Sequence, residues 1–148
     1  MTSPLSAPTL SSPSPESADS TLPHILVVED SLTSVAVISR DLREYYTLLH
    51  ARDGEAAWEM LLSDPRIELV ITDVQMPVLD GPQAWAAIRR LDPHVRCCFM
   101  AGYACGYSAD RLLGLGAARV FAKPFHDLAA FAETVRSLVS PEPVVTTP

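Results

Sequence analysis

The sequence predicts an α/β fold in which a five-stranded, doubly wound parallel sheet is covered by helices on both faces. Between residues 24 and 139, short apolar runs alternate five times with segments of helical periodicity. The run Leu69, Val70, Ile71 has no alternating polar positions, which is typical of a strand buried on both faces of a parallel sheet. Regular alternation of strands with helices favours parallel crossovers over hairpins.

The five strands are predicted from short apolar segments that end at a charged residue, a glycine or a helix-capping residue. They are residues 25–28, 46–50, 69–73, 96–100 and 120–122. A helix follows each strand, with apolar residues at helical spacing. Ser31 can cap the first helix, whose apolar positions run as far as Tyr45, and Pro82 suits the first turn of the third. The remaining helices are expected from Asp53-Gly54, from about Ser108 and after Phe125.

The length and composition indicate one domain with short flanking segments. A chain of 148 residues matches the usual size of a single domain. Residues 1–23 hold seven serines and five prolines with no Lys or Arg, which is typical of a disordered arm and not of a signal peptide. We therefore expect a folded domain at 24–139 and a flexible tail at 140–148.

The charge of the chain bears on its partners and location. With 18 acidic and 11 basic residues the formal net charge is −7, which argues against nucleic acid or an anionic membrane as a direct partner.

No apolar stretch reaches the length of a membrane span. Three cysteines are too few for a disulfide framework, so we expect a cytoplasmic protein with buried thiols at Cys97 and Cys98.

Charged residues follow three of the predicted strands. Glu29 and Asp30 follow the first, Asp73 ends the third and Lys123 follows the fifth. The carboxyl ends of parallel strands share one edge of a sheet, so these side chains can converge. Three carboxylates in one pocket repel each other unless a cation lies among them, and Mg²⁺ is the natural cation for oxygen ligands. Taken singly, each acid also fits a cap at a turn or helix start.

The basic residue of this group is unusual within the chain. Lys123 is the only lysine, whereas the other basic side chains are ten arginines. A compact ammonium beside carboxylates that bind a metal suits a phosphoryl group, whose oxygens attract both cations. The alternative is a lysine that only pairs with an acid at a strand end.

Four motifs in this order resemble a known family. They are residues 27–31 (Val-Val-Glu-Asp-Ser), 70–77 (Val-Ile-Thr-Asp-Val-Gln-Met-Pro) with Asp80-Gly81, 116–117 (Gly-Ala), and 122–125 (Ala-Lys-Pro-Phe). From about residue 24 to 139 the chain resembles the receiver domain of two-component response regulators. The resemblance implies a flavodoxin-like sheet of order 2-1-3-4-5.

The resemblance also implies a role for each site residue. Asp73 would be the phosphoacceptor in a phosphorelay, phosphorylated by a histidine kinase or a histidine phosphotransfer protein. Asp30 and Asp73 would bind Mg²⁺ directly, Glu29 through water, and Gln75 through its backbone carbonyl. Lys123 would contact the phosphoryl oxygens and precede a cis proline. Such a protein is a signalling phosphoacceptor that catalyses only its own phosphorylation and dephosphorylation.

Two positions depart from the family pattern. Ala101 stands where receivers carry a hydroxyl that contacts the phosphoryl group, and Val120 stands where they carry a switch aromatic. We therefore expect phosphorylation with a weakened or rerouted switch, in which Tyr103 or a water takes the place of the hydroxyl. The alternative is a receiver-like docking module that works unphosphorylated. A phosphatase of the haloacid dehalogenase type needs a second aspartate where Gln75 stands, which argues against that class.

Overall fold

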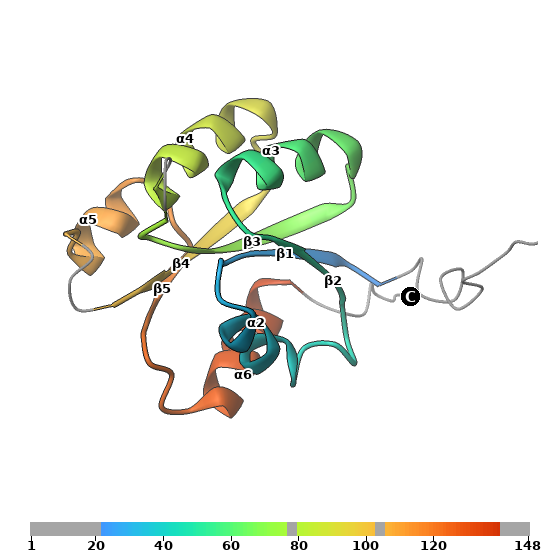
Figure 1. Ribbon diagram of the computed structural model, residues 1–148, viewed down its shortest axis with the longest axis vertical. Helices are drawn as coiled ribbons and strands as arrows, with labels where there is room; N and C mark the ends of the chain where they lie inside the picture. Colours follow the sequence, from blue (N-terminus) through green and yellow to red (C-terminus); the bar gives the residue numbers. More distant parts are fainter. Residues whose placement is uncertain (1–21, 77–79, 103–105, 140–148) are drawn as a thin grey trace, which may run out of the picture.

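The computed structural model describes residues 22–76, 80–102 and 106–139. Five parallel strands form one sheet of order β2-β1-β3-β4-β5, as predicted (Figure 1). The strands are β1 (His24–Val28), β2 (Thr47–Ala51), β3 (Ile67–Asp73), β4 (Arg96–Ala101) and β5 (Arg119–Ala122). The predicted tail and the predicted arm, apart from Leu22 and Pro23, lie outside the described residues.

Helices cover both faces of the sheet, which confirms the doubly wound architecture. The helices are α2 (Leu32–Ser39), α3 (Gly54–Ser63), α4 (Gly81–Leu91), α5 (Ala109–Gly114) and α6 (Leu128–Leu138). Helices α3 and α4 lie on one face together with α5, whereas α2 and α6 lie on the other (Figure 1). Each described loop that leads from a strand to a helix therefore runs over the same edge of the sheet.

Two apolar cores form because side chains alternate between the faces of each strand. In β1, Leu26 and Val28 belong to the core under α3, α4 and α5, while Ile25 and Val27 belong to the core under α2 and α6. All four side chains are at most 1% exposed. Burial on both faces explains why the strand sequences are uninterrupted apolar runs.

Side-chain caps begin each of these helices at the carboxyl edge of the sheet. Each capping side chain accepts a hydrogen bond from the backbone N–H three residues later: Ser31, Asp53, Asp80, Ser108 and Asp127. Asp80 and Gln83 form a reciprocal capping box, and Pro82 lies in the first turn of α4, as predicted. These caps fix the residue at which each loop ends and each helix begins along the carboxyl edge of the sheet.

The first helix is shorter than its periodicity predicts. We expected helical spacing through Tyr45, but α2 ends at Ser39, and residues 40–45 form turns closed in part by i to i+3 hydrogen bonds. Just beyond these turns, the hydroxyl of the buried Tyr46 donates to the carbonyl of Val139, the residue that follows α6. Tyr45 is 37% exposed, whereas Tyr46 is 2% exposed. Strand β2 begins at Thr47, so the strand prediction beginning at Tyr46 was one residue early.

The third strand is longer than predicted. It begins at Ile67 and includes the exposed Glu68, which a search for an unbroken apolar run excludes. Its other end is as expected, because Asp73 is the last residue of β3 and is paired with Met100 of β4. The central strand therefore carries the acid to the edge where the loops lie.

Candidate functional site

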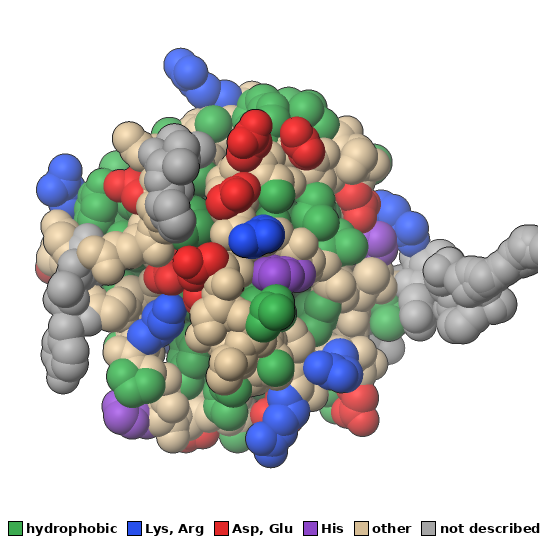
Figure 2. Space-filling view, in the orientation of Figure 1, with side chains coloured by type: hydrophobic (Ala, Val, Ile, Leu, Met, Phe, Trp, Pro, Cys, Tyr) green, Lys and Arg blue, Asp and Glu red, His purple; other side chains and the backbone are tan. Residues whose placement is uncertain are grey.

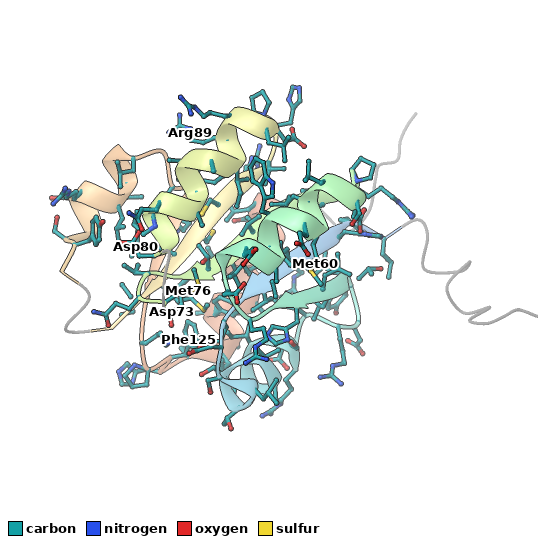
Figure 3. All side chains as sticks on the ribbon, turned by 45° about the horizontal axis from the view of Figure 1, so that its top comes forward. Met60, Asp73, Met76, Asp80, Arg89 and Phe125 are labelled. Atoms are coloured by element: carbon teal, nitrogen blue, oxygen red, sulfur yellow. The ribbon has the colours of Figure 1, made fainter. Side chains whose placement is uncertain are left out.

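The structure brings the four charged residues together at the carboxyl edge of the sheet. Lys123 Nζ lies 3.2 Å from Glu29 Oε1 and 3.2 Å from Asp73 Oδ2. Glu29, Asp30 and Asp73 each offer a carboxylate oxygen, and these oxygens lie within 4.8 Å of one another. Figure 3 shows Asp73 at this end of the sheet, and Figure 2 shows acidic side chains gathered on one face with basic side chains beside them.

Asp73 is held by its backbone and has little freedom to move. The N–H of the next residue, Val74, donates to Met100 at 3.0 Å, and the hydroxyl of Thr72 donates to the Asp73 carbonyl at 3.0 Å. The N–H of Gly81 then donates to the Val74 carbonyl at 2.8 Å. A Cβ at Gly81 would lie 2.4 Å from the Asp73 carbonyl oxygen, so only glycine lets α4 begin this close to the acid.

Glu29 is the most deeply buried acid of the site. It is 1% exposed, and its carboxylate accepts hydrogen bonds from Lys123 and from the N–H of Ser31 at 3.1 Å. Its backbone N–H donates to Ala51 at 3.0 Å, and its carbonyl accepts from His50 Nε2 at 2.8 Å. Asp30, the next residue, is exposed. The two acids therefore occupy the inner and outer parts of the same pocket.

The electrostatics follow from this burial. Burial raises the pKa of the Glu29 carboxyl above its ordinary value, and the charge of Asp73 acts in the same direction, although bonds from Ser31 and Lys123 oppose both. Burial acts to lower the pKa of Lys123, but the charge of Asp73 and the bonds to both carboxylates outweigh it and raise this pKa. The pocket therefore holds one ammonium against three carboxylates and favours a further cation.

We expect the Glu29→Gln variant to be more stable than the wild type at neutral pH without divalent cations. A raised pKa in the folded state gives stability that is present below the ordinary value of about 4.5 and is lost as the pH rises through the raised pKa. Glutamine mimics the protonated form, so the variant should be more stable than the wild type at neutral pH, and the difference should vanish in acid. Urea unfolding with EDTA across this pH range measures it. A variant less stable than the wild type at neutral pH would contradict this account.

The donor set fits a hard divalent ion. Three carboxylates supply oxygen ligands, one of them exposed, and Mg²⁺ prefers such ligands together with water. Gln75, expected to contribute its carbonyl, lies two residues beyond Asp73 with an exposed side chain. The three acids alone therefore carry the geometric argument for a metal.

The two atypical positions lie on the paired strands β4 and β5. Ala101 is the last residue of β4, and its carbonyl accepts from the N–H of Lys123 at 2.9 Å. Val120 packs with the core under α3 and α4, whereas Phe121 packs with the opposite core against Phe125 and Phe131, as strand alternation predicts. Tyr103, the suggested substitute for the missing hydroxyl, lies outside the described residues.

Sequence reasoning missed two contacts at the site. The His50 ring reaches the Glu29 carbonyl, and the hydroxyl of Tyr107 donates to Asp80 Oδ2 at 3.3 Å, joining the loop before α5 to the cap of α4. The only available signal was the position of His50 near a strand end, because the sequence does not show which strand lies beside β1. Both contacts connect segments distant in sequence.

A cleft opens beside Lys123 between α2 and the segment that leads to α6. Its volume is about 450 Å³, and its lining residues are Thr33, Ser34, Val37, Lys123, Pro124 and Phe125. The peptide bond between Lys123 and Pro124 is cis, as expected. Leu32 and Val37 of α2 are 73% and 39% exposed, so an apolar surface borders the charged pocket.

Comparisons with known proteins agree with this geometry. The response regulator receiver domain model matches residues 25–136. Response regulator GtcR of Aneurinibacillus migulanus is 35% identical over 111 residues, covering 73% of this chain and 44% of that protein. Response regulator receiver protein CpdR of Brucella abortus is 29% identical over 104 residues, covering 70% of this chain and 86% of that protein. The crystal structure of a response regulator receiver domain protein from Clostridium thermocellum matches with a TM-score of 0.72 at 23% identity, covering 80% and 94% of the two chains.

The part of each relative that the chain covers shows which domain they have in common. It spans less than half of GtcR and most of CpdR, so the common part is the receiver fold. None of the helices in the described ranges is long and apolar enough to cross a membrane. With the fold, the acidic cluster and the family match over residues 25–136 in agreement, the chain belongs to the response regulator receiver family of two-component systems.

Proposed function

We propose that Asp73 accepts a phosphoryl group from a histidine kinase or a histidine phosphotransfer protein in a phosphorelay. The observation that carries the proposal is the bridge from Lys123 Nζ, at 3.2 Å, to both Glu29 and Asp73, within a pocket where Asp30 adds a third carboxylate. Receivers as a family are phosphoacceptors, and this pocket retains a nucleophile and a cation. The chain would thus be a signalling intermediate that catalyses only the gain and loss of its own phosphoryl group.

The transfer itself needs few groups. A carboxylate oxygen of Asp73 attacks phosphorus as the N–P bond of a phosphohistidine breaks, forming an acyl phosphate. The bonding pair stays on the ring nitrogen, and the histidine leaves as a neutral imidazole when its other ring nitrogen is protonated in the donor. Lys123 lies where it can neutralise charge on the transferred oxygens. Hydrolysis of the acyl phosphate later restores the Asp73 carboxylate and releases inorganic phosphate.

Mg²⁺ would be held by Asp30 and Asp73 directly, by Glu29 through water, and by the Gln75 carbonyl. When bound, it supplies charge neutralisation that lets an anionic donor approach an acidic pocket. The excess of carboxylates over ammonium supports this assignment, because the pocket otherwise keeps like charges close together.

The donor would approach through the cleft beside Lys123. The cleft combines apolar residues of α2 and Phe125 with the ammonium, so a helical surface with a phosphohistidine could pack there and reach Asp73. A protein partner in the cytoplasm accords with a net charge of −7 and with the free, buried thiols of Cys97 and Cys98. We therefore propose neither nucleic acid nor membrane as a direct partner.

The direct test uses acetyl phosphate as the donor. The full chain is incubated with acetyl phosphate, with and without Mg²⁺, and its intact mass is measured over time. One added phosphoryl group that requires Mg²⁺ supports the proposal. Release of inorganic phosphate over many turnovers, without a modified protein, would instead favour a hydrolytic enzyme.

We further propose that the conformational response to phosphorylation is weakened, because Ala101 has no hydroxyl. A hydrogen bond to a charged group contributes about 1.5 to 3 kcal/mol, so its absence reduces the shift between two states by roughly ten- to a hundred-fold. We expect Ala101→Thr to restore this shift. Beryllofluoride should then produce larger changes in the amide NMR shifts of β4 and α5 in the variant than in the wild type.

Ala101→Val is the matched control, because valine has the shape of threonine without the hydroxyl. It should respond to beryllofluoride as the wild type does. If the valine and threonine variants respond equally, the hydroxyl is not the missing element. If Ala101→Thr changes the spectrum equally without beryllofluoride, the effect is one of packing.

The second candidate function is a docking module that acts without phosphorylation. Ala101 and Val120 favour it, since they remove the two groups that normally report the phosphoryl state. It predicts the same partner affinity for the wild type and for Asp73→Asn, with or without beryllofluoride. The phosphoacceptor proposal predicts that only the wild type changes its affinity.

A further inference from the structure

We propose that His50 is a positioning residue for the magnesium site, because its ring fixes the peptide that joins Glu29 to Asp30. The inference rests on the proposed function, since it assumes that the acidic pocket binds Mg²⁺. His50 lies on β2 and carries none of the ligand atoms in the acidic cluster. Its effect would reach the metal only through the backbone of β1.

The contact replaces a hydrogen bond that the sheet does not provide. The β1–β2 pairing is in register from His24 to Val28, and the N–H of Glu29 makes one more bond to Ala51 at 3.0 Å. Strand β2 then ends, since Asp53 caps α3. The carbonyl of Glu29 instead accepts a hydrogen bond from His50 Nε2 at 2.8 Å. Because the partner is a carbonyl, the ring must donate from Nε2.

The position of this peptide matters because, among the described residues, no side-chain contact fixes the orientation of the Asp30 carboxylate. Within these ranges, no residue donates a hydrogen bond to the Asp30 carboxylate or forms an ion pair with it, and this side chain is exposed. Glu29 differs, since its carboxylate is held by both Lys123 and Ser31. The direction in which Asp30 leaves the strand is therefore set by the peptide whose carbonyl oxygen His50 holds.

The expected effect is a loss of metal affinity. Groups that orient a metal ligand without touching the metal typically change affinity by about 10- to 100-fold when removed. His50 acts through a peptide, so we expect the lower end, with a roughly tenfold weaker Mg²⁺ affinity for His50→Leu. Leucine keeps apolar bulk on β2 but has no N–H to donate.

Two further variants separate positioning from stability. His50→Gln can place its side-chain N–H near the position of the ring Nε2, so it should bind Mg²⁺ within about twofold of the wild type. Leu49→Ala removes packing from the adjacent position on β2, where Leu49 contacts the core under α3 and α4. It should lower thermal stability without changing Mg²⁺ affinity.

The experiment is a calorimetric titration of the full chain with MgCl₂ at a temperature where every variant is folded. Weaker binding by His50→Leu, recovery in His50→Gln and unchanged binding in Leu49→Ala would support the inference. Equal affinity of His50→Leu and the wild type would overturn it, as would equal weakening in Leu49→Ala. If the wild type itself binds no Mg²⁺, the proposed function fails first, and the two failures are thereby distinguished.

Discussion

The Asp73→Asn variant should take up no phosphoryl group from acetyl phosphate under conditions in which the wild type is modified. An amide is a poor nucleophile, and the substitution also removes one of the three carboxylates of the pocket. Loss of an attacking group lowers a rate by several orders of magnitude, so we expect at least about a 10³-fold decrease. Intact-mass measurement after incubation with acetyl phosphate and Mg²⁺ gives the result directly.

The matched control for this prediction is Asp110→Asn. Asp110 is an exposed residue in the first turn of α5, and it undergoes the same chemical change away from the pocket. It should be phosphorylated at the rate of the wild type. A label that persists in Asp73→Asn and maps to Glu29 or Asp30 would assign the acceptor to another acid. Asp73→Asn should be folded, because relief of the repulsion with Glu29 offsets the lost ion pair with Lys123, and Asp110→Asn should be folded because Asp110 is exposed.

Lys123→Met should give the second largest effect, on both transfer and stability. The ammonium bridges Glu29 and Asp73 and is only 26% exposed, so its removal leaves two carboxylates without their shared cation. Removing one partner of a fully buried ion pair costs about 3 to 5 kcal/mol, and solvent screening at this partly exposed lysine lowers the expected cost to about 1 to 3 kcal/mol. Acyl phosphate formation should also slow by about 10²-fold, because one neutralising charge is lost. Urea unfolding and the acetyl phosphate assay measure the two effects.

The pH dependence of this stability loss follows from the raised pKa of Lys123. A raised pKa means that the stabilisation is fully present below the ordinary lysine value of 10.5 and is lost as the pH rises through the higher folded-state value. The difference between the wild type and Lys123→Met should therefore be constant near neutral pH and disappear only in strong alkali. A difference that vanishes near pH 7 would contradict the ion-pair account.

Lys123→Arg separates charge from shape. Arginine keeps the positive charge but is planar and larger than an ammonium, so it should retain much of the stability. Phosphoryl transfer should remain slow in this variant if a compact cation is needed. Full activity with arginine would show that Lys123 contributes only its charge.

The sheet and the gathering of charges at one edge were predictable because both depend on local patterns. Buried parallel strands leave uninterrupted apolar runs, and parallel connectivity places every strand end at the same edge. The order of residues along the chain is therefore enough to expect Asp73, Asp30 and Lys123 in one place. Their roles in metal binding and phosphoryl transfer remain predictions, which the variants above test.

What the sequence could not reveal depends on distant contacts. Tyr46, which follows the turns after α2, donates its hydroxyl to a carbonyl 93 residues away, and no periodicity within the helix carries that information. The His50 ring meets Glu29 because β2 pairs with β1 at a particular register, 21 residues apart in the chain. Tyr107 and Asp80 likewise meet only once α4 and α5 are packed on one face.

The close approach of Gly81 to Asp73 places a helix that carries a tryptophan directly against the acceptor. Helix α4 begins with no room for a methyl group between its first residue and the Asp73 carbonyl, so a displacement of that carbonyl presses on the helix. Trp85 lies one turn further along α4, is 5% exposed, and donates its indole N–H to Leu115 at 3.2 Å. The emission of Trp85 is therefore expected to respond to events at the acceptor, and a variant that lacks Trp58 of α3, the other tryptophan of the chain, would isolate that signal.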